Sequence, residues 1–369
     1  MRVVAVVGTR PEVIKLAPVV AELRHRPSTE AVLVSTGQHR EMLDQMLDVF
    51  GLVPDVELGV MRRDQQLCEL TSELMRGLGA TLASLRPDWV VVQGDTTTTL
   101  CGALAGFYAG VPVAHVEAGL RSGDNHAPFP EEANRRLVSP LATLHFCPTP
   151  ASARNLVAEA VPRELVRVTG NTVIDALHWA VGRARELPEA VSRLRPRRIL
   201  LTAHRRENHG AALHDICLAA RALAARGDVE IVFPLHRSPA VRGVVVPRLG
   251  GVPGIHLCEP LDYLSLVHVL DSCDLVLTDS GGLQEEGPAL GKPVLVLRDT
   301  TERPEAIEAG VARLVGTNAA DVYGAAAWLL EDPVAYAAMA HPENPFGDGH
   351  ASGRIVDALA DTRPLARAA

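Results

Sequence analysis

Short apolar runs alternate with longer segments of helical periodicity along the whole chain. The first series of runs is VVAVVG, AVLVSTG, WVVVQGD, VPVAHVEAG, TLHFCPT and VRVTGN. A second series begins at RRILLTAHRREN and continues through VEIVFPLHR, IHLCEPL, DLVLTDSGG, PVLVLRD and ARLVG. Strands that are apolar along their length and separated by helices are typical of parallel sheets covered by helices. The pattern predicts an α/β protein with two Rossmann-like domains that face a cleft.

The two series are separated by residues 173–197, which are helical in pattern at first and rich in Arg and Pro afterwards. This composition predicts a hinge and linker. We therefore expect a first domain over residues 1–172 and a second over residues 198–369, with a C-terminal helix that packs back on the first domain. A length of 369 residues agrees with two domains, because it exceeds the usual size of one hydrophobic core.

Charge and cysteine usage narrow the class of ligand. The net charge is −8, with acidic and basic residues interspersed, so no basic surface for nucleic acid or membrane is predicted. The six cysteines show no CxxC spacing, which argues against a disulfide framework and structural zinc. The apolar run at the N-terminus is too short for a signal peptide or a membrane span. We expect a cytoplasmic protein that binds no metal.

Polar and glycine-bearing segments follow most of the predicted strands. Ligands of parallel α/β sheets bind at the carboxyl ends of the strands, so these exits are candidate site segments. They are Gly8-Thr9-Arg10-Pro11-Glu12, Gln93-Gly94-Asp95-Thr96, Glu117-Ala118-Gly119, Ala203-His204-Arg205-Arg206-Glu207-Asn208 and Asp279-Ser280-Gly281-Gly282.

The turn Ser280-Gly281-Gly282 is a candidate phosphate site, since it combines backbone N–H groups with the start of a predicted helix. The alternative is a plain strand–helix turn with Ser280 as the N-cap. Glu285 and Glu286 follow in the first helical turn, where a Glu that faces the ligand could accept hydrogen bonds from ribose hydroxyls. The alternative is that both only stabilise the helix dipole. Arg303 is a candidate phosphate partner, with a surface salt bridge as its alternative.

The first strand exit lacks the GxGxxG fingerprint, which counts against a dinucleotide cofactor. Arg10 and Lys15 lie about one helical turn apart at the start of the next predicted helix. Two cations in this arrangement suit a pyrophosphate. The alternative is a solvated helix end.

Three acidic residues, Asp95, Glu117 and Glu131, lie at strand exits or just beyond one. Carboxylates that converge in a partly dry cleft acquire separated pKa values, so that one acts as an acid and another as a base. The alternatives are an N-cap role for Asp95 and a charged first helical turn for Glu131 or Glu132. His204 heads a polar run after an apolar strand, with a helix cap as its alternative.

Motifs in the same order as in one known family run through the chain: GTRPEVIKL, TGQHREML, GDTTTT, HVEAGLRSGD, PFPEEANRR, TGNTVIDAL, TAHRREN, DSGGLQEE and GKPVLVLRDTTERPE. Together they resemble the bacterial non-hydrolysing UDP-N-acetylglucosamine 2-epimerases, from Met1 to about Gly353. The resemblance implies a GT-B-like fold, a homodimer, and interconversion of UDP-GlcNAc and UDP-ManNAc without metal or nicotinamide.

The resemblance also implies roles for individual residues. The second domain would bind the nucleotide: Ser280 and Gly282, with Gly281 between them, hold the diphosphate, and Glu286 takes the ribose. Arg10, Lys15 and Arg303 would complete the anion site. Asp95, Glu117 and Glu131 match the essential acids of the family, and His204 its essential histidine.

An effector site for UDP-GlcNAc occurs in some members, and the matching residues here are Gln38, Arg40, Gln65 and His236. Asp64 stands where those members have an Arg, so substrate activation is expected to be weak.

The expected chemistry is elimination of UDP to a bound 2-acetamidoglucal, followed by re-addition with inverted protonation at C2. Three alternatives stay open at this point. They are the same chemistry on a modified UDP-sugar, a GT-B retaining glycosyltransferase, and a sugar-nucleotide sensor without catalysis.

Overall fold

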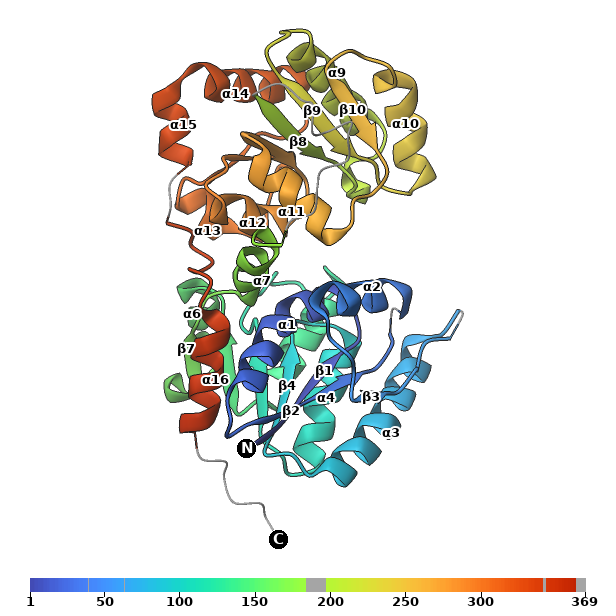
Figure 1. Ribbon diagram of the computed structural model, residues 1–369, viewed down its shortest axis with the longest axis vertical. Helices are drawn as coiled ribbons and strands as arrows, with labels where there is room; N and C mark the ends of the chain where they lie inside the picture. Colours follow the sequence, from blue (N-terminus) through green and yellow to red (C-terminus); the bar gives the residue numbers. More distant parts are fainter. Residues whose placement is uncertain (39, 63, 184–196, 341–342, 363–369) are drawn as a thin grey trace. The chain divides into compact units, whose positions relative to one another are not determined.

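The computed structural model describes residues 1–38, 40–62, 64–183, 197–340 and 343–362 (Figure 1). The chain divides into two compact units, Met1–Ala176 with Phe346–Ala369, and Leu177–Pro345. The division falls inside helix α7 (Thr172–Val181), close to the boundary expected at residue 172. Residues 184–196 of the expected linker lie outside the described residues.

The first unit is built on a 7-stranded sheet with the order β3-β2-β1-β4-β5-β6-β7, in which all pairings are parallel. Its strands are β1 (Arg2–Val7), β2 (Glu30–Ser35), β3 (Val56–Glu57), β4 (Trp89–Gln93), β5 (Val113–Val116), β6 (Leu144–Cys147) and β7 (Val166–Val168). Its helices, apart from α7, are α1 (Arg10–His25), α2 (Arg40–Phe50), α3 (Leu67–Leu85), α4 (Thr97–Tyr108), α5 (Glu131–Val138), α6 (Pro150–Ala158), the 3₁₀ turn η1 (Arg163–Leu165) and α16 (Ala351–Asp361).

The second unit repeats this plan on a 6-stranded parallel sheet with the order β10-β9-β8-β11-β12-β13. Its strands are β8 (Arg198–Thr202), β9 (Glu230–Pro234), β10 (Ile255–Cys258), β11 (Leu275–Thr278), β12 (Val294–Val296) and β13 (Ala312–Leu314). Its helices are η2 (Arg206–Asn208), α9 (Ala211–Ala224), α10 (Pro239–Leu249), α11 (Tyr263–Ser272), α12 (Leu283–Ala289), α13 (Pro304–Glu308), α14 (Ala319–Glu331) and α15 (Pro333–Met339). The predicted α/β class with two Rossmann-like units is confirmed.

Both sheets reverse their strand order at one point, between β1 and β4 in the first unit and between β8 and β11 in the second. Such a switch point opens a crevice at the carboxyl ends of the two strands, because the loops that follow them turn to opposite faces of the sheet. The loops after β1 and β4 carry Arg10 and Asp95, and those after β8 and β11 carry His204 and Ser280. The topology therefore brings together predicted site residues that are far apart in the sequence.

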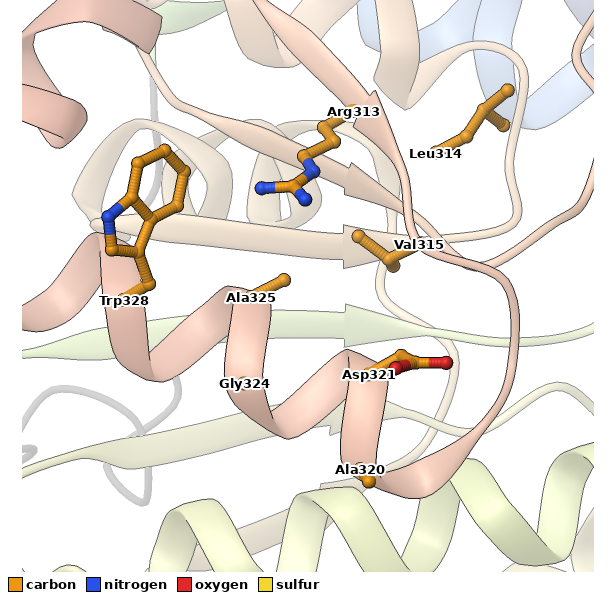
Figure 2. A pocket seen from close by; sticks show the side chains of 8 residues that line it. All are labelled: Arg313, Leu314, Val315, Ala320, Asp321, Gly324, Ala325 and Trp328. Carbon is orange, nitrogen blue, oxygen red and sulfur yellow. The ribbon is translucent and has the colours of Figure 1, made fainter.

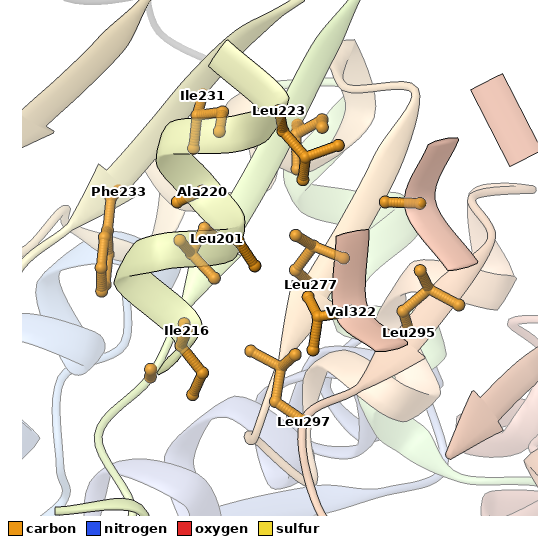
Figure 3. Packing of buried hydrophobic residues seen from close by; sticks show 14 of the residues in the cluster. Leu201, Ile216, Ala220, Leu223, Ile231, Phe233, Leu277, Leu295, Leu297 and Val322 are labelled. Carbon is orange, nitrogen blue, oxygen red and sulfur yellow. The ribbon is translucent and has the colours of Figure 1, made fainter. Parts of the chain in front are cut away.

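Each unit has its own hydrophobic core. In the first unit, valines of β1 and β4 pack against Leu74, Leu78 and Leu82 of α3. In the second unit, residues of α9 and α14 pack on the central strands, as Figure 3 shows for Ile216 and Val322. These cores hold the strand exits in a fixed register, so the loops that carry the candidate site start from rigid positions.

The last helix belongs to the first unit, against α1. Asp175 anchors its start, since it accepts hydrogen bonds from the backbone N–H groups of Ala351 and Ser352 at 3.2 and 2.8 Å. Arg26 forms an ion pair with Asp357 at 2.6 Å. In the described part of the chain, no helix has both the length and the apolar character needed to cross a bilayer.

Candidate functional site

A buried carboxylate joins the two loops at the switch point of the first unit. Glu12, which is 2% exposed, accepts hydrogen bonds from the backbone N–H groups of Gly8 and Thr9 at 2.7 Å each. Its other oxygen accepts from the hydroxyls of Thr96 at 2.6 Å and Thr99 at 3.0 Å. Burial raises the pKa of Glu12 despite these donors. The residue ties the loop that leads to Arg10 to the loop that carries Asp95.

Glu117 lies at the end of β5 and is held by three donors. Lys15 Nζ lies 2.5 Å from its Oε1, Asn171 Nδ2 donates to the same oxygen at 3.1 Å, and Gln93 Nε2 donates to Oε2. The backbone of Glu117 has a φ of 62°, a left-handed conformation that is uncommon for a residue other than glycine and is often found at functional sites. Lys15, predicted to bind phosphate, is thus in contact with the predicted catalytic acid.

Asp95 is held by helix α5. Arg135 Nη2 lies 2.6 Å from Asp95 Oδ2, and Asn134 donates to the Asp95 carbonyl at 2.8 Å. The N-cap of α4 is Thr96, whose hydroxyl accepts from the N–H of Thr99, so the N-cap alternative for Asp95 is wrong. Glu131 begins the same helix, one turn before the residues that hold Asp95.

The neighbouring acids Glu131 and Glu132 have different environments. Glu132 is fully buried and accepts hydrogen bonds from the backbone N–H groups of Ser122 at 3.0 Å and Gly123 at 3.4 Å. Burial alone would raise its pKa, but these bonds and the contact with Arg135 lower it overall. Glu131 is partly exposed and free to meet a ligand. Of the two acids, only Glu131 is therefore accessible from outside the protein.

A buried histidine, His115 of β5, contacts the loop that carries Asp95. His115 Nε2 contacts the backbone carbonyl of Gly94, the residue before Asp95, at 2.7 Å. Burial lowers the pKa of His115 to about 4, so the ring is neutral at pH 7. A neutral ring must donate from Nε2 to make this contact, because a carbonyl oxygen only accepts.

The switch point of the second unit also holds a buried carboxylate, Asp279. Its Oδ2 accepts from the backbone N–H groups of His204 and Arg205, both at 2.8 Å, and from Asn208 Nδ2 at 3.0 Å. The ring nitrogen Nδ1 of His204 lies 3.1 Å from Oδ1. Burial raises the pKa of Asp279, but the contacts with His204 and the backbone donors outweigh it and lower the pKa overall.

Two arginines approach the turn that follows Asp279. A methyl group placed on Gly281 would lie 3.6 Å from Arg205 Nη2 and 3.9 Å from Arg303 Cζ. Arg303 also forms an ion pair with Glu285, and the two side chains are only 15% and 3% exposed. The pair is therefore not the surface salt bridge considered as an alternative. The N-cap of α12 is Gly282, so Ser280 does not cap this helix.

The remaining predicted residues lie in both units. Glu286 Oε2 would lie 3.7 Å from a methyl group on Gly282, next to the same turn. Arg10 begins α1 and is exposed. Arg40 begins α2, but its side chain lies outside the described residues.

The predicted effector residues also have local partners. In the first unit, Thr98 donates to Gln38 Oε1 at 2.8 Å, and Gln65 Nε2 donates to the Val60 carbonyl at 3.1 Å. In the second unit, His236 stacks on His204, with ring centroids 5.7 Å apart and planes at 18°. The structure thus pairs a predicted effector residue with the predicted catalytic histidine.

A pocket of about 560 Å³ lies elsewhere in the second unit, between β13 and α14 (Figure 2). Arg313 and Trp328 line this pocket, and the Arg313 guanidinium lies over the Trp328 ring, 5.5 Å from the ring centroid. No predicted site residue lines this pocket. The polar loops at the switch points, not this pocket, carry the groups expected for chemistry on an anionic ligand.

Comparison with known proteins identifies the family of the chain. A model of the UDP-N-acetylglucosamine 2-epimerase family matches residues 21–360. The chain belongs to this family. Enzymes named UDP-N-acetylglucosamine 2-epimerase from Salmonella typhimurium and Yersinia pestis are 49% and 48% identical to it, over 98% and 97% of this chain and 99% and 98% of their own.

A solved structure agrees with this family assignment. The crystal structure of UDP-GlcNAc 2-epimerase from Neisseria meningitidis bound to UDP-GlcNAc matches with a TM-score of 0.89 and 45% identity, over 98% of this chain and 100% of that one. The expected GT-B-like two-domain fold of the 2-epimerase family is thereby confirmed.

Sequence patterns assigned no individual role to several residues at the switch points of this 2-epimerase family member. Arg135 lies in the PEEANRR motif, but its contact with Asp95 spans 40 residues. Asp279 directly precedes the Ser280 turn, and a lone acid after a strand was the one available signal. Arg205 lies beside His204, and only the spatial approach to Gly281 distinguishes it from the neighbouring arginine.

Proposed function

We propose that the protein interconverts UDP-GlcNAc and UDP-ManNAc by inverting C2 of the sugar, without metal or nicotinamide. The observation that carries the proposal is the set of ionised side chains at each switch point. Asp95 and Glu117 lie at the first, paired with Arg135 and Lys15. Arg205 and Arg303 approach the glycine turn at the second, where Arg303 is also paired with Glu285. Family membership over nearly the whole chain, with a relative crystallised with UDP-GlcNAc, supports this substrate.

The second unit binds UDP in this proposal. Arg205 and Arg303 meet the diphosphate beside the Ser280-Gly281-Gly282 turn, where the absence of a Cβ on Gly281 allows phosphate oxygens to come close to both guanidinium groups. Charge-assisted hydrogen bonds from guanidinium groups suit phosphate oxygens in number and geometry. Glu286, next to the turn, accepts from the ribose hydroxyls. Of the two cations predicted at the start of α1, Arg10 is exposed and stays a proposed partner of the diphosphate, whereas the charge of Lys15 is balanced by Glu117.

The chemistry follows from the acidity of the C2 proton. This carbon is not adjacent to a carbonyl, so simple deprotonation is too costly. Elimination avoids the problem: a base removes the C2 proton while the C1–O bond to UDP breaks, which leaves a 2-acetamidoglucal and free UDP in the site. Protonation of C2 from the opposite face and return of UDP to C1 then complete the inversion.

Two acid/base groups on opposite faces of the sugar are required, and we assign them to Asp95 and Glu131. Glu117 is the orienting residue, since three donors already fix its carboxylate. Glu131, by contrast, is partly exposed at the start of α5, as a proton carrier must be. His204 lies in the second unit and offsets the charge that develops on the departing diphosphate.

Proton NMR in D₂O tests the proposal with UDP-GlcNAc as the only added substrate. We expect UDP-ManNAc to appear and both sugars to gain deuterium at C2, with no added metal or nicotinamide. A Glu131→Gln variant is the control, since it should stop both exchange and epimerisation. Epimerisation without solvent exchange would contradict elimination, and a requirement for NAD would contradict the whole scheme.

The homodimer and the cytoplasmic location expected from the sequence stay predictions. Light scattering of the purified protein, with and without UDP, tests the homodimer, and fractionation of the cells tests the location.

A further inference from the structure

The side chains of Asp279 and His204 define which ring nitrogen of the histidine carries a proton. We propose that Asp279 is a positioning residue that holds the proton of the neutral His204 ring on Nδ1, so that Nε2 is the atom that gains a proton and then donates it in a hydrogen bond to the anionic ligand. The inference rests on the proposed function for the role of His204, but the tautomer itself can be measured independently of activity.

The first step is the state of the carboxylate. Asp279 is 0% exposed, and its Oδ2 already accepts three hydrogen bonds, from His204 N, Arg205 N and Asn208 Nδ2. These donors favour the ionised form, and the pKa of Asp279 lies below its usual range. An ionised carboxylate only accepts hydrogen bonds.

The second step is the other carboxylate oxygen. Oδ1 is buried, and no hydrogen bond of good geometry reaches it from the described residues. The nitrogen Nδ1 of His204 lies 3.1 Å from this oxygen. The His204 side chain is 37% exposed, but Asp279 is fully buried. If Nδ1 lacked a proton, its lone pair would face a lone pair of the buried oxygen, which would then have no donor. The proton therefore belongs on Nδ1.

The third step is the neighbouring ring. His236 stacks on His204, and its Nδ1 accepts a hydrogen bond from the backbone N–H of Ser238 at 3.1 Å. Its proton must then lie on Nε2. The two stacked rings are thus expected to be opposite tautomers, His204 with Nδ1–H and His236 with Nε2–H, and the stack limits rotation of the His204 ring.

Nitrogen-15 NMR of the imidazole rings tests the inference on the full-length protein with ¹⁵N-labelled histidine. The spectrum is recorded near pH 9, where a histidine of ordinary pKa is neutral. His204→Gln and His236→Gln assign the two signals by their loss. We expect the Nδ1–H pattern for His204 and the Nε2–H pattern for His236. An Nε2–H pattern for His204 in the parent protein would overturn the inference without any variant of Asp279.

Asp279→Asn extends the test. Its amide can still accept the backbone donors through oxygen, and it then presents an NH₂ group to His204, which should move the proton to Nε2. Asn208→Ala is the matched control, because it removes a donor to the same carboxylate without changing what faces Nδ1. We expect the tautomer to change in Asp279→Asn alone. The same tautomer in both variants would overturn the inference.

Kinetics separate this inference from the proposed function. Asp279→Asn should lower kcat by about 10²-fold, the lower end of what an acid/base group contributes, with little change in KM. Loss of activity in Asn208→Ala to the same extent would show a structural effect and overturn the positioning role. If the parent protein has the Nδ1–H tautomer but no epimerase activity on UDP-GlcNAc, the proposed function fails and the tautomer assignment stands.

Discussion

Lys15 and Glu117 form an ion pair of 2.5 Å in which the two side chains are 15% and 5% exposed. The pair links helix α1 to the end of β5, and Asn171 and Gln93 donate to the same carboxylate. A lysine at a helix start is expected to meet solvent or an anionic ligand. Here it contacts a carboxylate of the protein, which fixes the orientation of Glu117.

Removing Lys15 should destabilise the first unit, because it leaves a buried carboxylate without its cation. We expect Lys15→Met to lower the free energy of opening of β4 and β5 by up to about 3 to 5 kcal/mol, measured by amide hydrogen exchange. The double variant Lys15→Met with Glu117→Gln should recover much of this loss. Arg24→Met is the control: its pair with Asp55 is 37% and 47% exposed, so the change should stay within about 1 kcal/mol. If Lys15→Met alone and the double variant lose the same free energy of opening, Lys15 and Glu117 are not energetically coupled.

The Lys15–Glu117 pair shows which part of the site could be predicted from sequence. Glu117 directly follows an apolar run, and parallel strands place their exits on one edge, so its position near other polar loops could be derived. Its partner could not, because the two residues are 102 positions apart. The contact depends on β1, β4 and β5 being neighbours. No pattern along the chain reveals this strand order. The sequence therefore predicted a phosphate, and not Glu117, as the partner of Lys15.

The same limit explains what was missed in the second unit. Asp279 and His204 meet because β11 pairs with β8, with Thr278 opposite Thr202. His236 was assigned to an effector site by resemblance, whereas its stacking on His204 follows from the pairing of β9 with β8. Periodicity indicates where strands end, but strand order arises from packing of the whole sheet. The fold class could therefore be predicted, and the individual contacts at the switch points could not.

Substitution of the proposed proton carriers should reduce turnover far more than the affinity for UDP. We expect Asp95→Asn and Glu131→Gln each to lower kcat by ~10²- to 10⁴-fold, as is usual for acid/base groups, with the affinity for UDP unchanged. Glu132→Gln, at the residue next to Glu131, is the control. Since Glu132 is buried and holds the backbone of residues 122–123, its loss should mainly lower stability. Steady-state kinetics with calorimetry of UDP binding separates these outcomes, and a fully active Glu131→Gln would remove that residue from the mechanism.

Removal of either arginine beside Gly281 should weaken UDP binding. A charge-assisted hydrogen bond contributes about 1.5 to 3 kcal/mol, so Arg205→Ala and Arg303→Ala should each raise the Kd for UDP by roughly 10- to 100-fold. Calorimetry measures this directly. Arg313→Ala is the control, because this arginine of the same unit stacks on Trp328 away from the turn.

Arg303 needs a second variant, because its loss also removes the guanidinium that pairs with the buried Glu285. Without the charge of Arg303, the carboxylate of Glu285 would itself repel a diphosphate bound at the turn. If Arg303→Ala with Glu285→Gln binds UDP as tightly as the parent protein, Arg303 acts by neutralising Glu285 and does not contact the ligand. If the double variant stays weak, the direct contact is supported.

The buried His115 should make the first unit sensitive to mild acid. Burial lowers its pKa from 6.5 to about 4, so the folded state excludes a proton that the unfolded chain binds. The stability that depends on the neutral ring is complete above pH 6.5 and is lost as the pH falls towards 4.

His115→Gln tests this dependence, since the amide keeps a donor for the Gly94 carbonyl and does not titrate. Between pH 7 and pH 5 the parent protein should lose about 1 to 2 kcal/mol more than the variant in the opening free energy of β5. Hydrogen exchange at the two pH values measures the difference. Parallel losses in both proteins would show that His115 is not the titrating group.

Asp64 should suppress activation by UDP-GlcNAc. It is exposed, has a φ of 57°, and directly precedes Gln65, whose amide contacts the Val60 carbonyl and Glu73. A second UDP-sugar bound at this segment would bring its diphosphate near a carboxylate, where the resemblance places a cation in activated members. Exchange of attraction for repulsion costs roughly 1 to 3 kcal/mol, which weakens effector binding about five- to more than a hundredfold.

The reverse reaction is the sharper assay, because UDP-ManNAc alone contains no effector at the start. We expect the parent protein to turn over UDP-ManNAc without a lag, and Asp64→Arg to introduce a lag that trace UDP-GlcNAc removes. Because Asp tolerates the left-handed conformation better than Arg, Asp64→Asn is a second variant that removes the charge without added strain, and it should give partial activation. Glu164→Arg, the same change in charge at the exposed turn η1 of the same unit, is the control. Strong activation of the parent protein by UDP-GlcNAc would mean that Asp64 lies outside the effector site.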